Sequence, residues 1–399
     1  MQFNFFKNKN QRIHLDYAST TPVHKEVFDE MRPYFSNLWA NPSSIYKEGV
    51  QARKVIEESR IKLARTLAVR PSDITFTSGG TESNNLALIG IVESLHDDGR
   101  PYEDMEIIST KIEHPSIGKT LTFLEKKGVR IMYSSIDDEG RIDISELATI
   151  FNTKTVLVTF AYANSETGVV QDIKKITRAV RLWNEEHEAK ILIHTDASQA
   201  PLWLPCELDM LGVDLMTLDA GKCYGPKGAG ALVHRHWVKL NPNILGGGQE
   251  HGLRAGTENT AHIVGCVYAI VRAQEGYESR SLAVAKLRDE FFELLTSEID
   301  GIVVNGSREF RIANNINISI PNVDTEYVVI WLDAKGVAAA TRSACGSGKE
   351  TGSHVVREMT NDEARATSTL RFTLGEESTV ADVYCAVKIL KDYLKCSKI

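Results

Sequence analysis

The sequence has few cysteines, no long apolar run and no excess of basic residues, and each absence excludes a class of protein. Its six cysteines among 399 residues form no CxxC pair and no zinc-type spacing, which favours free thiols over disulfides or a metal site. No apolar run approaches the length of a membrane span. A formal charge of −7 without a basic stripe disfavours binding to nucleic acid or to a membrane surface.

The N-terminus also lacks the apolar segment and the small-residue cleavage site of a signal peptide. We therefore expect a cytoplasmic protein that binds no metal ion, no nucleic acid and no membrane. Hydrophobic residues make up 42% and charged residues 25% of the chain, which is typical of a soluble globular protein. The length predicts two domains.

Short apolar runs alternate with amphipathic stretches through the first two thirds of the chain. Strands are predicted over 73–77, 106–109 and 155–159, and helices after them over 82–95, 117–127 and 173–185. This alternation predicts an α/β domain whose largely parallel sheet is covered by helices.

After residue 265 the pattern changes. The elements predicted there are a long helix, two short strands and two further helices (266–296, 301–305, 315–320, 325–334 and 380–394). We therefore predict a large domain over 17–265 and a smaller α+β domain over 266–399, against which the opening residues 1–16 pack.

Lys222 and Asp196 each end or follow a short apolar run that predicts a buried strand. Because the βα loops of a parallel sheet gather at one edge, we expect these two side chains to meet there. Pyridoxal phosphate chemistry needs such a pair, one amine to form an imine with the aldehyde and one carboxylate to keep the pyridine nitrogen protonated. Taken singly, Lys222 could be a surface lysine and Asp196 a helix N-cap.

Gly80 and Thr81 stand between a predicted strand and the start of a helix. The glycine allows close backbone approach, and the Thr81 hydroxyl with the first helical N–H groups would bind an anion such as phosphate. A plain helix N-cap explains the same residues equally well.

Other polar side chains also follow predicted strands. His114 could stack on an aromatic ring or pass protons, or be a structural hydrogen bonder. Asn164 and Ser165 offer an amide and a hydroxyl to the same edge, although these residues also make ordinary turns. Gln199 could donate to a bound cofactor or be a solvated helix residue.

Three further features suggest function. Residues 246–257 are too glycine-rich for regular structure, so we expect a loop that crosses a phosphate or a subunit interface, or else a flexible linker. Cys345 lies among small residues, where a thiol can be a reachable nucleophile, whereas Cys266 and Cys385 lie in apolar stretches and are expected in the core. Arg371 lies inside an apolar run, so it should face a carboxylate, a substrate's or a structural one.

Motifs in this order resemble those of cysteine desulfurases of the NifS/IscS type, members of the class V aminotransferases. The resemblance covers nearly the whole chain and rests above all on residues 15–22, 76–86, 194–199, 222–228 and 370–375. It implies a fold-type I pyridoxal phosphate transferase with a mainly parallel seven-stranded sheet in the large domain. It also implies a homodimer with each active site at the dimer interface.

The resemblance assigns the contacts with the cofactor to particular residues. Lys222 would be the Schiff-base lysine, Asp196 would pair with the pyridine nitrogen, and His114 would stack on the ring. The other contacts would come from Gln199 at the phenolic oxygen, Gly80 and Thr81 at the phosphate, Asn164, and Thr257 of the other subunit.

The resemblance also implies the reaction. Arg371, helped by Asn164 and Ser165, would hold the carboxylate of L-cysteine, while Lys222 moves the proton. Cys345 would take the sulfur as a persulfide and alanine would leave. The sulfur would pass to an acceptor protein such as an iron–sulfur scaffold, for clusters or for transfer-RNA thiolation. The alternatives are a selenocysteine lyase or another class V aminotransferase-like enzyme, and a degenerate homologue that acts as a binding partner.

The chain departs from the family pattern in four places. Residues 219–221 are Asp-Ala-Gly where the family commonly has Ser-Gly-His, so two phosphate donors are lost and Asp219 would repel a phosphate. Ser165 replaces a second asparagine, and Tyr46 and Arg342 replace a histidine and a glycine. These departures predict weaker cofactor binding, or substitute donors from a neighbouring loop.

Overall fold

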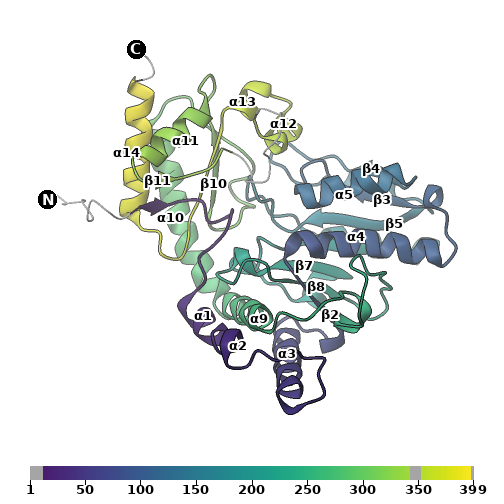
Figure 1. The fold of residues 1–399 in the computed structure, drawn as a ribbon. Helices are drawn as coiled ribbons and strands as arrows, with labels where there is room; N and C mark the ends of the chain where they lie inside the picture. The colour runs from purple at the N-terminus through teal and green to yellow at the C-terminus, as the bar shows by residue number, and fades with distance from the viewer. Residues whose placement is uncertain (1–11, 342–351, 397–399) are drawn as a thin grey trace.

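A seven-stranded sheet forms the centre of the computed structural model, which describes residues 12–341 and 352–396 (Figure 1). The strand order is β2-β8-β7-β6-β5-β3-β4. Only β8 runs antiparallel to its neighbours, so the predicted, largely parallel sheet is confirmed. The strands are β2 (Ile74–Thr77), β3 (Glu106–Ser109), β4 (Arg130–Tyr133), β5 (Thr155–Ala161), β6 (Leu192–Asp196), β7 (Leu215–Asp219) and β8 (Gly230–His234).

Helices cover both faces of this sheet, which is why its central strands are apolar without alternation. Successive residues of one strand belong to different cores: Leu157 packs with α4 and α5, and Val158 packs with the core on the opposite face. One face is covered by α4 (Gly80–Asp97) and α5 (Pro115–Lys126). The opposite core includes α3 (Lys47–Thr66), α7 (Ile173–His187) and α9 (Thr260–Glu275). The shorter helices are α1 (Lys25–Met31), α2 (Pro33–Ser36), α6 (Ile144–Ile150) and α8 (Leu208–Leu211).

The long helix predicted over 266–296 is wrong, because two helices meet at Gly276. There α9 ends, and α10 (Tyr277–Glu298) begins after a residue with non-helical torsion angles, φ −126° and ψ 11°. Arg280 stabilises the break, since its guanidinium donates to the carbonyls of Arg272 and Ala273 at the end of α9. The domain boundary near residue 265 stays a prediction, and α9 runs through that position while packing on α1 and α3.

The C-terminal region contains a small antiparallel sheet in which β10 (Asn315–Ser319) lies between β9 (Val303–Val304) and β12 (Thr369–Thr373). Its helices are α11 (Thr325–Ala334), α12 (His354–Thr360), α13 (Glu363–Thr367) and α14 (Val380–Cys396). The opening strand β1 (Ile13–His14) pairs with β11 (Val337–Ala338), which joins this strand to the C-terminal region. No helix within the described residues has the length and apolarity that crossing a membrane requires.

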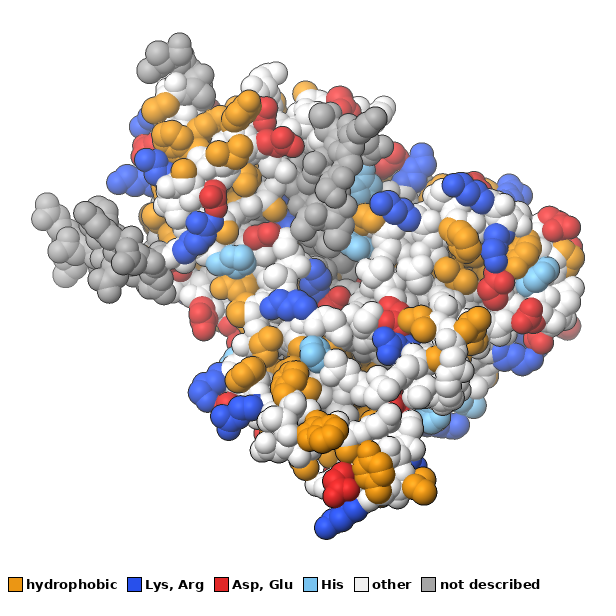
Figure 2. Space-filling model, viewed as in Figure 1, with side chains coloured by type: hydrophobic (Ala, Val, Ile, Leu, Met, Phe, Trp, Pro, Cys, Tyr) orange, Lys and Arg blue, Asp and Glu red, His pale blue; other side chains and the backbone are white. Residues whose placement is uncertain are grey.

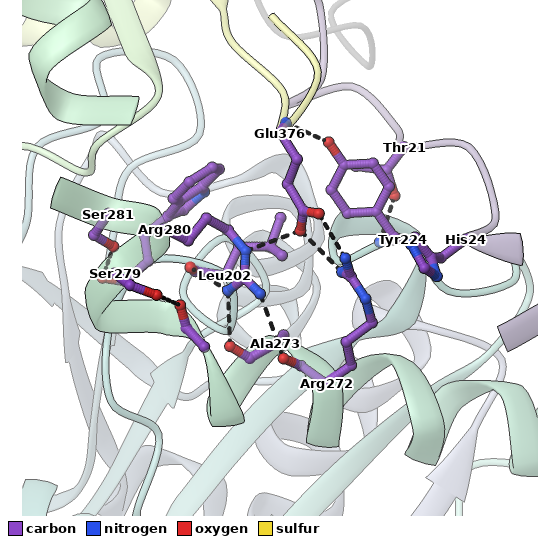
Figure 3. A network of polar contacts seen from close by, with 12 residues as sticks. Thr21, His24, Leu202, Tyr224, Arg272, Ala273, Ser279, Arg280, Ser281 and Glu376 are labelled. Atoms are coloured by element: carbon purple, nitrogen blue, oxygen red, sulfur yellow. Dashed lines mark hydrogen bonds and ion pairs between the residues drawn. The ribbon is translucent and has the colours of Figure 1, made fainter. Parts of the chain in front are cut away.

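Glu376, just after β12, ties the C-terminal region to the large sheet region (Figure 3). Its carboxylate accepts two hydrogen bonds from Arg272 of α9, at 2.9 and 2.6 Å, and pairs with Arg280 of α10 at 2.9 Å. Its N–H donates to the Tyr224 hydroxyl at 2.8 Å. Burial opposes ionisation of Glu376, but the two guanidinium groups outweigh it and lower the pKa. Because Tyr224 is two residues from Lys222, this network also anchors the loop that carries the lysine.

Candidate active site

A cavity of about 150 Å³ lies at the carboxyl ends of the parallel strands, where the opening segment and β12 also reach the sheet. The predicted residues that line it are Gly80, Thr81, His114, Asn164, Ser165, Asp196, Gln199, Lys222 and Arg371. Thr257 is exposed and does not line this cavity. Cys345 and Arg342 lie outside the described residues.

Asp196 is the last residue of β6 and is held by neutral donors. Its Oδ1 accepts from the N–H and hydroxyl of Ser198, at 2.9 and 2.6 Å, and its Oδ2 accepts from Asn84 at 2.7 Å. Asn84 is 1% exposed, and its Oδ1 has no hydrogen-bond partner among the described residues. Sequence reasoning missed Asn84 and Ser198. The signal for Asn84 was its position one turn after Gly80, on the helix that starts at the sheet edge.

Lys222 closes the 3₁₀ turn Ala220–Lys222 that follows β7. Its Nζ donates to the carbonyls of Ala18 and Ser19, at 3.0 and 2.5 Å. Gln199, which is 9% exposed, donates to the same Ala18 carbonyl at 3.0 Å. The opening segment therefore supplies the backbone acceptors that place both side chains in the cavity, a role that sequence reasoning did not find.

His114 is the N-cap of α5, and its Nδ1 accepts from the Ser116 N–H at 3.2 Å. The Ser116 hydroxyl accepts from Asn84 and lies 2.8 Å from the same Nδ1, so it donates its own proton to the ring. Burial, with a smaller contribution from Lys222, lowers the pKa of His114, although Asp196 opposes this. The ring is therefore neutral at neutral pH and carries its proton on Nε2.

Glu113, the residue before His114, is buried. Burial raises its pKa and the charge of Asp196 adds to this rise, while hydrogen bonds from Thr110 and the Ala161 N–H oppose it, so that the pKa lies at about 8. Glu113 is therefore protonated at neutral pH, which leaves Asp196 as the charged carboxylate at this end of the cavity.

Arg371 faces a structural carboxylate, one of the two possibilities that the sequence left open. It is 1% exposed in β12, and its Nη2 donates to Asp16 at 2.8 Å and to the Ser19 hydroxyl at 3.1 Å. Its Nη1 donates to the Ser165 carbonyl at 2.8 Å. Its Nε is buried without a hydrogen-bond partner in the part of the chain that the structure describes.

Asn164 forms a turn, which was the alternative to a role in binding that its sequence position left open. Its Oδ1 accepts from the N–H groups of Glu166 and Thr167, at 2.9 and 3.0 Å. Its amide nitrogen donates to the Ile112 carbonyl at 2.9 Å. Asn164 thus shapes the wall of the cavity that carries the Ser165 carbonyl.

The end of the cavity formed by Gly80 and Thr81 holds a carboxylate. Asp219, the last residue of β7, accepts from the Gly80 N–H at 3.1 Å and from the Gly221 N–H at 2.8 Å. The carboxylate that the sequence predicts to repel a phosphate therefore lies at this end of the cavity, and the repulsion itself stays a prediction. The first helical N–H group of α4 is already paired.

The glycine-rich segment 246–257 is anchored at two points. Arg60 and Glu250, both buried, form a two-pronged ion pair at 2.9 and 2.8 Å. Arg254 pairs with Glu82 in the first turn of α4 at 3.0 Å. These contacts hold the segment beside the cavity and contradict the flexible-linker alternative.

The cysteines within the described residues differ in burial. Cys206, Cys223 and Cys266 are buried, and burial raises the pKa of each thiol, so they are poor nucleophiles. The core placement of Cys266 is confirmed, whereas Cys385 on α14 is only partly buried, because its side of the helix borders solvent.

Comparisons with known proteins agree with this geometry. The sequence profile of the family described as Aminotransferase class-V matches residues 13–385. A cysteine desulfurase IscS of Dictyoglomus turgidum is 38% identical over 381 residues, 96% of this chain and 94% of that protein. A solved NifS-like protein superimposes with a TM-score of 0.89 at 31% identity, covering 97% of this chain and all of the other.

A second solved structure, titled SspA in complex with cysteine, gives a TM-score of 0.77 at 32% identity, over 92% of this chain and all of that one. Both the family match and the full-length relatives span the sheet, the cavity and the C-terminal region together. The chain therefore belongs to the class V aminotransferase family.

Proposed function

We propose that the protein is a cysteine desulfurase that converts L-cysteine to L-alanine and leaves the sulfur as a persulfide on Cys345. The observation that carries this proposal is the single cavity in which Lys222, Asp196 and Arg371 meet. Full-length relatives that carry the desulfurase name support it.

The chain's class depends on pyridoxal phosphate, and the cavity fits this cofactor at its lysine and carboxylate ends. Asp196 ends β6 and Lys222 follows the neighbouring strand β7, and Asp196 is the acceptor that a protonated pyridine nitrogen needs. Two buried polar atoms among the lining residues, Asn84 Oδ1 and Arg371 Nε, have no partner within the described chain. Unpaired buried polar groups cost free energy, so these two favour a polar occupant.

When bound, the cofactor supplies an electron-accepting ring. Asp196, fixed by Asn84 and Ser198, stabilises positive charge at the pyridine nitrogen. The Lys222 amine takes the proton from the substrate Cα and returns it during product formation. His114, neutral because burial lowers its pKa, would stack on the ring without adding a second positive charge beside it.

Arg371 and the segment around Ser165 would hold the substrate carboxylate. Asp16 and the Ser165 carbonyl fix the two Nη atoms of the guanidinium, and the buried Nε has no partner within residues 12–341 and 352–396. We propose that the substrate carboxylate takes up this donor and shares the charge of Arg371 with Asp16. Such charge-assisted hydrogen bonds would fix the orientation of the substrate in the cavity.

Cys345 would be the sulfur acceptor. Its thiolate attacks the substrate sulfur, so that an S–S bond forms as the Cβ–S bond breaks. The electron pair of that bond stays with the carbon skeleton, which takes up a proton to give alanine. A cytoplasmic location, where thiols remain reduced, suits this chemistry, as does delivery of the persulfide to an acceptor protein.

The enzyme would work as a homodimer. Large hydrophobic side chains are exposed on α1, α2, α3 and their connections, and Figure 2 shows hydrophobic residues gathered over these helices. The exposed side chains include Phe28, Phe35, Trp39, Ile45 and Tyr46. Leu245, which is 81% exposed, directly precedes the glycine-rich segment 246–257 that carries Thr257. A second copy packed here would cover this surface and bring Thr257 to the partner's cavity.

Mass spectrometry of the protein after incubation with L-cysteine tests the proposal. We expect the peptide that contains Cys345 to gain about 32 Da, the mass of one sulfur atom, and we expect alanine in solution. Cys345→Ala should abolish both, with Cys396→Ala as the matched control. Alanine formation that survives Cys345→Ala would instead favour a lyase or another aminotransferase-like activity.

A further inference from the structure

Asp219 fills the position where an anion would meet the start of α4. This helix is 18 residues long, and its first N–H group, that of Gly80, donates to Asp219 Oδ2. The other carboxylate oxygen accepts from the Gly221 N–H. The side chain therefore spans the turn before Lys222 and the helix start.

The space around these groups is small. A Cβ atom added to Gly80 would lie 2.7 Å from the Ser198 hydroxyl and 3.3 Å from Asp219 Oδ2. Gly80, Thr81, Ser198 and Asp219 all line the same cavity. A phosphate that uses the Gly80 N–H must therefore displace the Asp219 carboxylate or lie against it.

Nearby cations have other partners. Arg254 is paired with Glu82, and Lys227 donates to the Thr21 carbonyl at 2.8 Å. A phosphate placed beside Asp219 would thus bring two like charges together in a partly enclosed site, which costs free energy.

We propose that Asp219 is an internal competitor for the phosphate of the cofactor, and that it sets the selectivity between pyridoxal phosphate and pyridoxal. This inference rests on the proposed cofactor site and deepens it. The helix dipole and the Gly80 N–H, which would favour a phosphate, already stabilise the Asp219 carboxylate. The phosphate group then adds little net affinity, while the contacts of Asp196 and Lys222 with the pyridine ring and aldehyde are unaffected.

Titration of the apo-protein with pyridoxal phosphate and with pyridoxal, followed by absorbance of the Lys222-bound cofactor, tests this selectivity. We expect Asp219→Asn and Asp219→Ser to raise the affinity for pyridoxal phosphate, relative to the affinity for pyridoxal, by about tenfold. The affinity for pyridoxal itself should stay nearly unchanged. The matched control is Asp98→Ser, which removes one charge from the far end of α4 and should leave the ratio unchanged. An unchanged ratio in both Asp219 variants would overturn the proposal, as would an equal gain for pyridoxal.

Inorganic phosphate gives a second readout that needs no chemistry at Lys222. Phosphate should raise the Tm of apo Asp219→Asn in a concentration-dependent manner, and should have a smaller effect on the wild-type apo-protein. Equal responses would contradict the competition. Both measurements are independent of sulfur transfer, so a failure of the desulfurase proposal at Cys345 would leave this result interpretable.

Discussion

The two ends of the cavity each hold an aspartate at the end of a central strand, yet the two carboxylates face opposite tasks. Asp196 ends β6 and accepts from the neutral side chains of Asn84 and Ser198 and from a backbone N–H. Asp219 ends the neighbouring strand β7 and occupies the N–H groups of Gly80 and Gly221. The first can stabilise a cation, whereas the second takes donors that an anion would use. Identical residues at equivalent places in a sheet thus gain their function from what their oxygens contact.

The largest effect should follow from neutralising the carboxylate at the first end. Asp196→Asn would keep the shape of the side chain but remove the charge that holds the pyridine nitrogen protonated. We expect the kcat for alanine formation to fall by about 10³, on the scale seen when one preorganised electrostatic partner is lost. Asp219→Asn is the matched variant, and its rate at saturating cofactor should stay within a few-fold of wild type. Similar losses in both variants would show that the two aspartates are not functionally distinct.

The ion-pair network behind Lys222 should give the next largest effect, on stability. Glu376→Gln leaves Arg272 and Arg280 without their carboxylate, and breaking a mostly buried pair costs about 3 kcal/mol. Because the folded-state pKa of Glu376 is lowered, its stabilisation is present above its ordinary pKa of 4.5 and is lost as pH falls through the lower folded value.

Urea unfolding of wild type and Glu376→Gln at several pH values checks this prediction. The stability difference should be full at pH 7 and shrink under acid conditions. Glu377→Gln, which removes the adjacent carboxylate, is the control and should change stability little. A difference that is constant with pH would contradict the role given to the charge of Glu376.

A smaller change should follow when the support of Asp196 is weakened. Asn84→Ala removes one donor to Asp196 Oδ2 and one to the Ser116 hydroxyl. We expect pyridoxal phosphate affinity to fall by about tenfold, since neighbours that orient a binding residue have effects of this size. Asn85, the next residue on α4, bonds to the Thr81 carbonyl and Thr120, so Asn85→Ala serves as control. Equal effects of the two alanines would argue against a specific role for Asn84.

The residues that end strands were predictable from sequence, and the residues that orient them were not. Lys222 and Asp196 follow apolar runs, and the parallel topology brings such positions to one edge. Asn84, Ser116 and Ser198 depend on side-chain directions across three elements, which no single pattern contains. The sequence indicated that Asp219 would repel a phosphate, but only the structure shows that it already holds the Gly80 N–H.

The same limit applies to longer segments. The 3.6-residue period continues across Gly276, so sequence predicted one helix where Arg280 stabilises a break between two. Arg371 was expected to face a carboxylate, and its partner Asp16 lies 355 positions away in the chain. Pairings at that separation depend on the assembled fold.

The smallest effect on activity should come from Glu113, because it is already neutral. Glu113→Gln reproduces the protonated side chain, which can still accept from the Ala161 N–H and interact with Thr110. We expect unchanged kcat at pH 7.

Burial raises the folded-state pKa of Glu113 to about 8, so wild type binds this proton more tightly when folded and loses stability as pH rises from the ordinary value of 4.5 through 8. The variant should therefore match wild type near pH 4.5 and unfold at a higher Tm than wild type at pH 9. If instead the variant were inactive at pH 7, a second charged carboxylate would belong to the Asp196 end, and the contrast between the two ends of the cavity would need revision.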